Sequence, residues 1–169
     1  MAKTQEQLKQ EVLHAQQNGD IASLYILEGQ AHEIFDEETL HAFYANILDL
    51  ALEKLTDTLE AARVMDMQEV QDFATLRALY EYAIEHYSAG VFHDAAALFE
   101  VLGGLSNDKE FSKALTIHRL ASEQQLPLEE FLESIADVEA TQEAGTFYIS
   151  RFQKTAQKLL ENSQNDGGN

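Results

Sequence analysis

The sequence has no cysteine and only one proline and eight glycines among its 169 residues. The absence of cysteine excludes disulfide frameworks, thiolate zinc sites and cysteine nucleophiles. The combined share of glycine and proline lies well below the roughly 12 % of average proteins. Because β-sandwiches and β-barrels need many tight turns, we expect an all-α protein whose helices are joined by short connections.

Basic residues are also scarce, since 11 Lys and Arg stand against 30 Asp and Glu and give a net charge of −19. A field of this sign repels phosphate backbones and anionic lipid headgroups, so we expect neither nucleic acid nor a membrane surface as a partner. The longest apolar runs, such as Ala95–Phe99, are too short for insertion into a membrane. Residues 1–18 lack the apolar core of a secretory signal, which predicts a cytoplasmic protein.

Apolar residues at intervals of three and four predict a series of helices along the chain. Asn18-Gly19-Asp20 predicts the end of one helix and the cap of the next, and Gly29 predicts a second stop. We expect Asp36 to cap the helix that follows and Asp57 to cap a shorter one. The other predicted boundaries are Gly90, Gly103-Gly104, Ser106–Asp108 and Pro127.

These boundaries predict a single all-α domain over residues 1–161. Residues 1–35 form an N-terminal helical arm in this interpretation, residues 36–141 form helical hairpins, and residues 142–161 form a C-terminal helix. Residues 162–169 are polar and glycine-rich, and we expect a disordered tail there. The C-terminal helix is expected to bury Ile149, Phe152, Ala156 and Leu159.

An internal match suggests a repeat with an offset of 36 residues. Thr39–Tyr44 and Thr75–Tyr80 share the pattern T-L-x-A-[FL]-Y, and apolar positions stay in phase further on, with Leu59 above Ala95. The offset is close to the roughly 34-residue period of helix–turn–helix solenoids. The alternative is that two amphipathic helices resemble each other over six positions by chance.

Residues 79–102, LYEYAIEHYSAGVFHDAAALFEVL, fit the tetratricopeptide pattern of two packed helices. Ala83 and Ala95 stand where the two helices cross closely, and Gly90 stands at the turn between them. The aromatic positions that seal the layer are filled by Phe92 and Phe99. The segment therefore predicts a helical hairpin.

The same segment, preceded by Thr75-Leu76, resembles the first repeat of the class II chaperones of type III secretion. Those all-α proteins keep translocator subunits soluble in the bacterial cytoplasm by holding a client segment in the groove of tetratricopeptide repeats. The resemblance implies tetratricopeptide-like hairpins in a right-handed solenoid-like domain, with extra N-terminal helices and a C-terminal helix. It implies binding of a secreted translocator or another secretion-system protein, and it is compatible with a homodimer.

The resemblance also implies which side chains face the client groove. In the first helix these are Tyr80, Ile84 and Tyr87, and in the next unit the nearest equivalents are Leu115 and His118. Tyrosine suits a groove because it offers apolar area together with a hydroxyl for a client backbone. The alternative is that all five residues belong to the hydrophobic core.

Two other function classes stay open beside the chaperone. One is a helical-repeat regulatory or scaffold protein of a secretion system with a different client. The other is a metal-carboxylate bundle enzyme, because Glu11…His14 and Glu38…His41 each put a carboxylate and an imidazole on one helix face. A chain rich in glutamate produces such pairs by chance, and no catalytic motif accompanies them. We therefore expect no enzyme activity, no metal and no cofactor.

Overall fold

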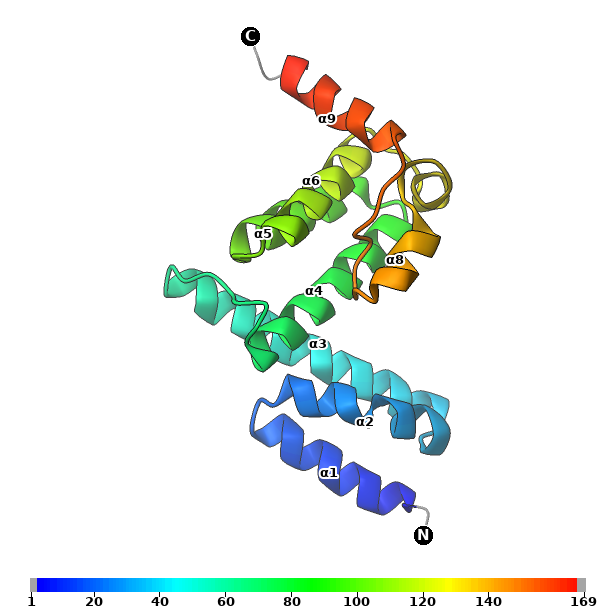
Figure 1. Ribbon diagram of the computed structural model, residues 1–169. Coiled ribbons are helices and arrows are strands. Elements are labelled where there is room, and N and C mark those ends of the chain that lie inside the picture. The colour runs from blue at the N-terminus through cyan, green and yellow to red at the C-terminus, as the bar shows by residue number, and fades with distance from the viewer. Residues whose placement is uncertain (1–2, 167–169) are drawn as a thin grey trace. The chain divides into compact units, whose positions relative to one another are not determined.

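The computed structural model describes residues 3–166 and is 76 % helical. Within this part of the chain no strand is formed, and the predicted all-α class is confirmed. The chain divides into two compact units, Met1–Leu79 and Tyr80–Asn169, which we call unit 1 and unit 2. Figure 1 shows the helices in chain order, with α4 carrying the boundary between the two units.

Unit 1 consists of α1 (Gln5–Gln17), α2 (Ile21–Ile34), α3 (Glu37–Glu60) and the first half of α4 (Val70–Ser88). The predicted boundary at residues 18–20 is confirmed, because Gly19 has a φ of 63° and Asp20 accepts a hydrogen bond from the Ser23 backbone N–H. Asp36 caps α3 in the same way, as expected. The three helices pack on one another through the buried side chains of Leu8, Val12, Ile21, Leu24, Phe43 and Ile47.

Two predicted boundaries in unit 1 are wrong. Gly29 lies inside α2, and Asp57 lies inside α3. A glycine in a helix costs only about 1 kcal/mol, which the burial of Leu24 and Ala31 on either side of Gly29 offsets. Asp57 is exposed, so its carboxylate stays solvated and does not interrupt the helix. α3 ends instead just before Ala62, whose φ is 54°.

Unit 2 begins with the second half of α4 and continues through six further helical elements. The predicted hairpin is present, because α4 ends before Gly90, with a φ of 78°, and α5 begins at Phe92. Ala83 and Ala95 are completely buried, as expected for crossing positions. The elements after α4 are α5 (Phe92–Leu105), α6 (Lys109–Glu123), α7 (Leu128–Glu130), the π-helical turn η1 (Phe131–Ile135), α8 (Val138–Ala144) and α9 (Thr155–Asp166).

α5 and α6 form a second hairpin, with Asp108 capping α6 as predicted. The expected stop at Gly103-Gly104 is wrong, because α5 continues to Leu105. The Ser112 hydroxyl of α6 donates a hydrogen bond of 2.7 Å to the Gly103 carbonyl. This contact and the burial of Leu105 hold the last turn of α5 in place.

The predicted C-terminal helix over residues 142–161 is wrong in its first part. α8 ends at Ala144, the next residue Gly145 has a φ of 72°, and residues 145–154 form a non-helical segment. Backbone hydrogen bonds of 2.8 Å join this segment to residues 135–137, from Asp137 N–H to Arg151 and from Gln153 N–H to Ile135. α9 then continues through residues 162–166, which were expected to be disordered, while residues 167–169 lie outside the described part.

The two segments that match at an offset of 36 residues do not have the same structure. Its first copy, Thr39–Tyr44 and the residues after it, belongs to the single uninterrupted helix α3. Its second copy is the hairpin of α4 and α5. The aligned positions Leu59 and Ala95 differ accordingly, because Leu59 is exposed and Ala95 is completely buried. A solenoid arrangement therefore has no support from this pair of segments.

Candidate interaction surface

The five residues predicted to face a client groove all lie in unit 2, and four of them are buried. Tyr80, Tyr87, Leu115 and His118 have exposed fractions of 4 %, 2 %, 0 % and 1 %, and Ile84 is half-buried. The expectation that the two tyrosines stay partly solvated is therefore wrong. Their burial favours the alternative in which these residues belong to the core.

A chain of hydrogen bonds links Tyr80 and His118 in this core. His118 Nδ1 lies 2.7 Å from the Ala114 carbonyl oxygen, to which it donates. His118 Nε2 is then the acceptor, and it receives the Tyr80 hydroxyl proton over 2.7 Å. The Tyr80 oxygen in turn accepts the Ile149 backbone N–H over 3.1 Å. All polar atoms of both side chains are satisfied, so the pair fits a neutral imidazole.

Burial lowers the pKa of His118 to about 4, because the charged imidazolium would lose its hydration. Burial raises the pKa of Tyr80 and of Tyr87 for the same reason, and it raises the pKa of Tyr148 to about 12. Aromatic rings surround the imidazole, with ring centroids 5.0 to 6.1 Å away. They belong to Tyr80, Phe99, Phe131 and Phe152. His118 and the four rings around it thus pack together in unit 2, and the imidazole there is neutral.

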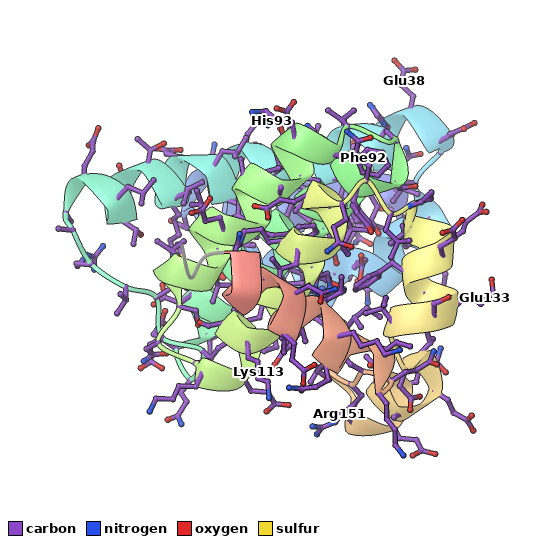
Figure 2. All side chains as sticks on the ribbon, turned by 90° about the horizontal axis from the view of Figure 1, so that it is seen from above. Glu38, Phe92, His93, Lys113, Glu133 and Arg151 are labelled. Atoms are coloured by element: carbon purple, nitrogen blue, oxygen red, sulfur yellow. The ribbon has the colours of Figure 1, made fainter. Side chains whose placement is uncertain are left out.

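Among the described residues, neither Glu-x-x-His pair belongs to a cluster that could bind a metal ion. Within residues 3–166, no group of three or more His, Asp or Glu side chains is placed to hold a metal ion. Figure 2 shows Glu38 pointing outward from its helix, and both Glu38 and His41 are exposed. The described helices also include none that is long and apolar enough to cross a bilayer.

Unit 1 carries an apolar depression on its surface, which we call the α2–α4 hollow. It has a volume of about 280 Å³ and lies between α2, the turn before α4 and the first turns of α4. Its walls include three exposed apolar side chains, Ile26, Val70 and Phe73, with exposed fractions of 80 %, 64 % and 43 %. The other lining residues are Ala22, Tyr25, Met67, Gln68, Ala74 and Arg77.

The spacing of these residues along their helices makes the hollow a groove between two helix faces. Ala22, Tyr25 and Ile26 are three and four residues apart on α2, and Phe73 and Arg77 are four apart on α4. Residues at these intervals project from one side of a helix. Two such faces meeting around a hollow are typical of a surface that receives a partner side chain or helix.

Polar contacts hold both ends of the hollow. At one end, the Gln71 side chain donates to Asp20 Oδ1 over 2.6 Å and accepts the Ala22 backbone N–H over 3.3 Å. Hydrogen bonds from the Ser23 side chain, Gln71 and the Ser23 backbone lower the pKa of Asp20, so its carboxylate stays ionised. These bonds connect the start of α2 to the start of α4.

At the other end, the Arg77 guanidinium lies 4.0 Å from the centre of the Tyr25 ring and 3.3 Å from Glu28 Oε1. Glu28 Oε2 accepts the Tyr44 hydroxyl proton over 2.6 Å, and the Tyr44 oxygen accepts from His32 Nε2 over 2.6 Å. α2, α3 and α4 are thereby joined through one network. The hollow is preformed, which lowers the entropic cost of binding.

The residues of the hollow were missed in the sequence. Ile26 lies five positions after Ile21, off the face that buries Ile21, Leu24 and Ala31, so an apolar residue there was a usable signal. Phe73 had no such signal, because it continues the spacing of Leu76 and Tyr80 and reads as core. Only the packing of unit 1 leaves it exposed.

A scan against protein-family models, a search of curated proteins and a search of solved structures each found no match to this chain.

Proposed function

We propose that the protein is a binding protein of the chaperone or adaptor type, acting in the bacterial cytoplasm on a secreted type III secretion protein. It would hold an apolar client segment and keep the client soluble. The observation that carries this proposal is the α2–α4 hollow, where Ile26, Val70 and Phe73 are exposed around a preformed depression. Large apolar side chains that gather at one exposed site are typical of interaction surfaces.

The hairpin of unit 2 also supports the proposal. Residues 79–102 resemble the first repeat of the class II chaperones, and they form two helices separated by Gly90, with Ala83 and Ala95 completely buried. In the proposed protein this hairpin contributes stability, because its tyrosines are buried. In this proposal the client binds to unit 1 and not to the hairpin.

The test measures client solubility and client binding together. A translocator protein from the same genome is co-expressed with the wild-type chain and with the Ile26→Asp variant. The wild type should raise the soluble fraction of the translocator and co-purify with it. Ile26→Asp should lose both effects while keeping the helical circular dichroism spectrum, because the side chain is 80 % exposed. A translocator equally insoluble with and without the wild-type chain would contradict the chaperone proposal.

The second candidate is a helical-repeat scaffold or regulator of a secretion system with a different client. The same hollow supports this candidate, because an apolar surface can bind a partner that is already soluble as well as one that is not. This candidate predicts co-purification of a secretion-system protein that is already soluble by itself. Measuring the solubility of each captured protein expressed without the chain separates the two candidates.

A further inference from the structure

We propose that unit 2 has a binding site for a non-helical peptide segment of a partner protein, and that residues 146–166 of the chain occupy this site as a displaceable strap. We call these residues the C-terminal strap and residues 80–145 the body of unit 2. Figure 1 shows the strap, in orange and red, leading from α8 into α9. The site shares no residue with the α2–α4 hollow, so this inference does not depend on the proposed function.

The body binds three consecutive backbone N–H groups of the strap. The Ile149 N–H donates to the Tyr80 hydroxyl oxygen over 3.1 Å. The N–H groups of Ser150 and Arg151 donate to the Thr141 hydroxyl oxygen over 3.3 and 3.1 Å. Hydrogen bonds to a main chain contribute affinity without requiring particular side chains. The same acceptors can therefore receive the backbone of another segment.

The next residues of the strap pair with the backbone at the end of η1. The Asp137 N–H donates to the Arg151 carbonyl, and the Gln153 N–H donates to the Ile135 carbonyl, each over 2.8 Å. The two bonds belong to an isolated antiparallel bridge. Backbone groups paired in this way are the ones that strand addition uses to bind a peptide. The body thus holds residues 149–153 as a protein holds a bound peptide.

Aromatic side chains of the strap define what a partner segment needs. The Phe111 ring of the body lies 5.7 Å from the Phe147 ring and 4.9 Å from the Tyr148 ring, centroid to centroid. The Phe152 ring lies 6.1 Å from the His118 imidazole. A partner segment of the same chemistry carries an aromatic pair and a third aromatic residue four positions further on.

The charge of the body favours a basic partner segment. The body has three Lys and Arg against 13 Asp and Glu, whereas the strap has three against two. The Arg151 guanidinium lies 3.2 Å from Glu110 Oε1 of α6, and about half of each side chain is exposed. Lys154 and Lys158 of the strap are exposed as well. A basic segment gains from the negative body, and an acidic one is disfavoured.

The strap is less deeply buried than the core of the body. Phe99 and Phe131 have exposed fractions of 0 %, whereas the lowest fraction among the described side chains of the strap is 4 %, at Ala156. Phe99 and Phe131 also pack against the Tyr87 ring, a contact that does not involve the strap. Segments with few deeply buried groups open at a lower free-energy cost than the core. We therefore expect the strap to leave while the body stays folded.

Hydrogen exchange of the unmodified full chain tests this opening. The N–H groups of Ile149, Arg151 and Gln153 should have protection factors at least about 100-fold lower than those of Phe99 and Leu115 in the body. Equal protection would mean that the strap leaves only when unit 2 unfolds, and the proposal would be wrong.

A peptide experiment tests the site itself. Fluorescence anisotropy with the full chain compares a labelled peptide of residues 146–161 with a scrambled peptide. The strap of the chain competes, so the apparent affinity depends on the open fraction. Tyr148→Ala with Leu159→Ala weakens only this strap and should raise the affinity for the peptide at least about ten-fold. Gln157→Ala, at an exposed position of α9, is the matched control and should change it less than about two-fold. Equal binding of the scrambled peptide, or no gain in the double variant, would overturn the proposal.

A surface variant covers the case in which the double variant does not fold. Arg151→Glu changes a side chain that is about half exposed, so the fold should be kept. It places a negative charge beside Glu110 and should raise the affinity for the peptide about three-fold. An unchanged affinity would contradict displacement of the strap.

A further substitution locates the peptide. In the background of the double variant, Thr141→Val removes the acceptor of two N–H groups and should weaken peptide binding about ten-fold. The matched control is Thr116→Val, since the Thr116 hydroxyl bonds to the Ser112 carbonyl within α6. Equal loss in both variants would show that the peptide does not bind where the strap lies.

Two measurements identify the occupant. A peptide with glutamate in place of its three basic residues should bind at least about ten-fold more weakly, and equal binding would contradict the basic chemistry. Size-exclusion chromatography should show the wild-type chain as a monomer. A dimer that the peptide dissociates would assign the site to the strap of a second copy and overturn the assignment to a partner protein.

Discussion

Both units bury large apolar side chains, but they differ in which ones they leave exposed. In unit 2 the rings of Tyr80, Tyr87, Phe99, Phe111 and Phe131 are buried, and the exposed large apolar side chains described there are the valines Val91, Val101 and Val138. In unit 1 an isoleucine and a phenylalanine are exposed at one hollow. A buried ring contributes to stability, and an exposed one can contribute to binding.

The two units also differ in how deeply their polar contacts are buried. Unit 2 buries a neutral pair, Tyr80 and His118, within its core. In unit 1 the ion pair of Arg77 and Glu28 lies beside the hollow. About a third of the Arg77 side chain and about a quarter of the Glu28 side chain are exposed. A buried neutral pair fixes the packing of a core, whereas a partly exposed ion pair contributes little to stability and orients a surface.

The largest expected effect is the loss of stability on removing two rings from unit 2. Tyr80→Ala with Tyr87→Ala removes side chains that are 4 % and 2 % exposed, so cavities should cost more than about 3 kcal/mol. Thermal melting followed by circular dichroism should show a large loss of helix at temperatures where the wild type is folded. Tyr80→Phe, which keeps the ring and removes only the hydroxyl, is the matched control and should remain folded. A double variant that melts like the wild type would place these tyrosines in an exposed groove.

The next effect is a loss of stability in acid that depends on His118. Its pKa is lowered to about 4 in the folded state, below the ordinary 6.5, so the unfolded chain binds more protons between these values. The stabilisation is therefore complete above pH 6.5 and is lost as the pH falls towards 4, by about 3 kcal/mol. Urea denaturation from pH 7.5 to pH 4 measures this loss.

The control for this measurement is His118→Gln, which cannot titrate but can donate to the Ala114 carbonyl and accept from Tyr80. Carboxylates titrate in both proteins, so the difference between wild type and variant isolates the imidazole. A difference that does not change with pH would show that His118 is accessible to protons in the folded state.

Overpacking of the hairpin should have a smaller effect. Ala83→Leu and Ala95→Leu each add bulk at a position with an exposed fraction of 0 %, which should cost about 1–3 kcal/mol. Ala97→Leu on the exposed side of α5 is the matched control and should change the stability by less than about 0.5 kcal/mol. Unchanged melting of either buried variant would mean that the two helices do not cross at these alanines.

The smallest effect on stability is expected at the hollow. Ile26→Asp changes a side chain that is 80 % exposed, so the free energy of unfolding should change by about 0.5 kcal/mol or less. Chemical denaturation measures this change, alongside the loss of binding described above. Destabilisation as large as that of the tyrosine variants would make Ile26 part of a core, and the contrast between the two units would disappear.

Much of the local structure could be predicted from the sequence. Asp20, Asp36 and Asp108 cap helices, and Gly90 ends one, because caps and turns depend on residues within a few positions. Gly29 and Asp57 were misread because packing and solvation can override a local signal of about 1 kcal/mol. The candidate site was not predictable in the same way, since four of the five proposed groove residues are buried.

The sequence by itself determined the all-α class, the acidic surface and the hairpin around Gly90, because composition and short-range spacing specify them. Only the tertiary structure decided which apolar faces are covered. His118 and Tyr80, 38 positions apart, become one buried pair because α4 and α6 carry them together with the non-helical segment at Ile149. Phe73, with the spacing of a core residue, remains exposed at the α2–α4 hollow. Burial depends on elements distant in the chain, and a local pattern does not contain their positions.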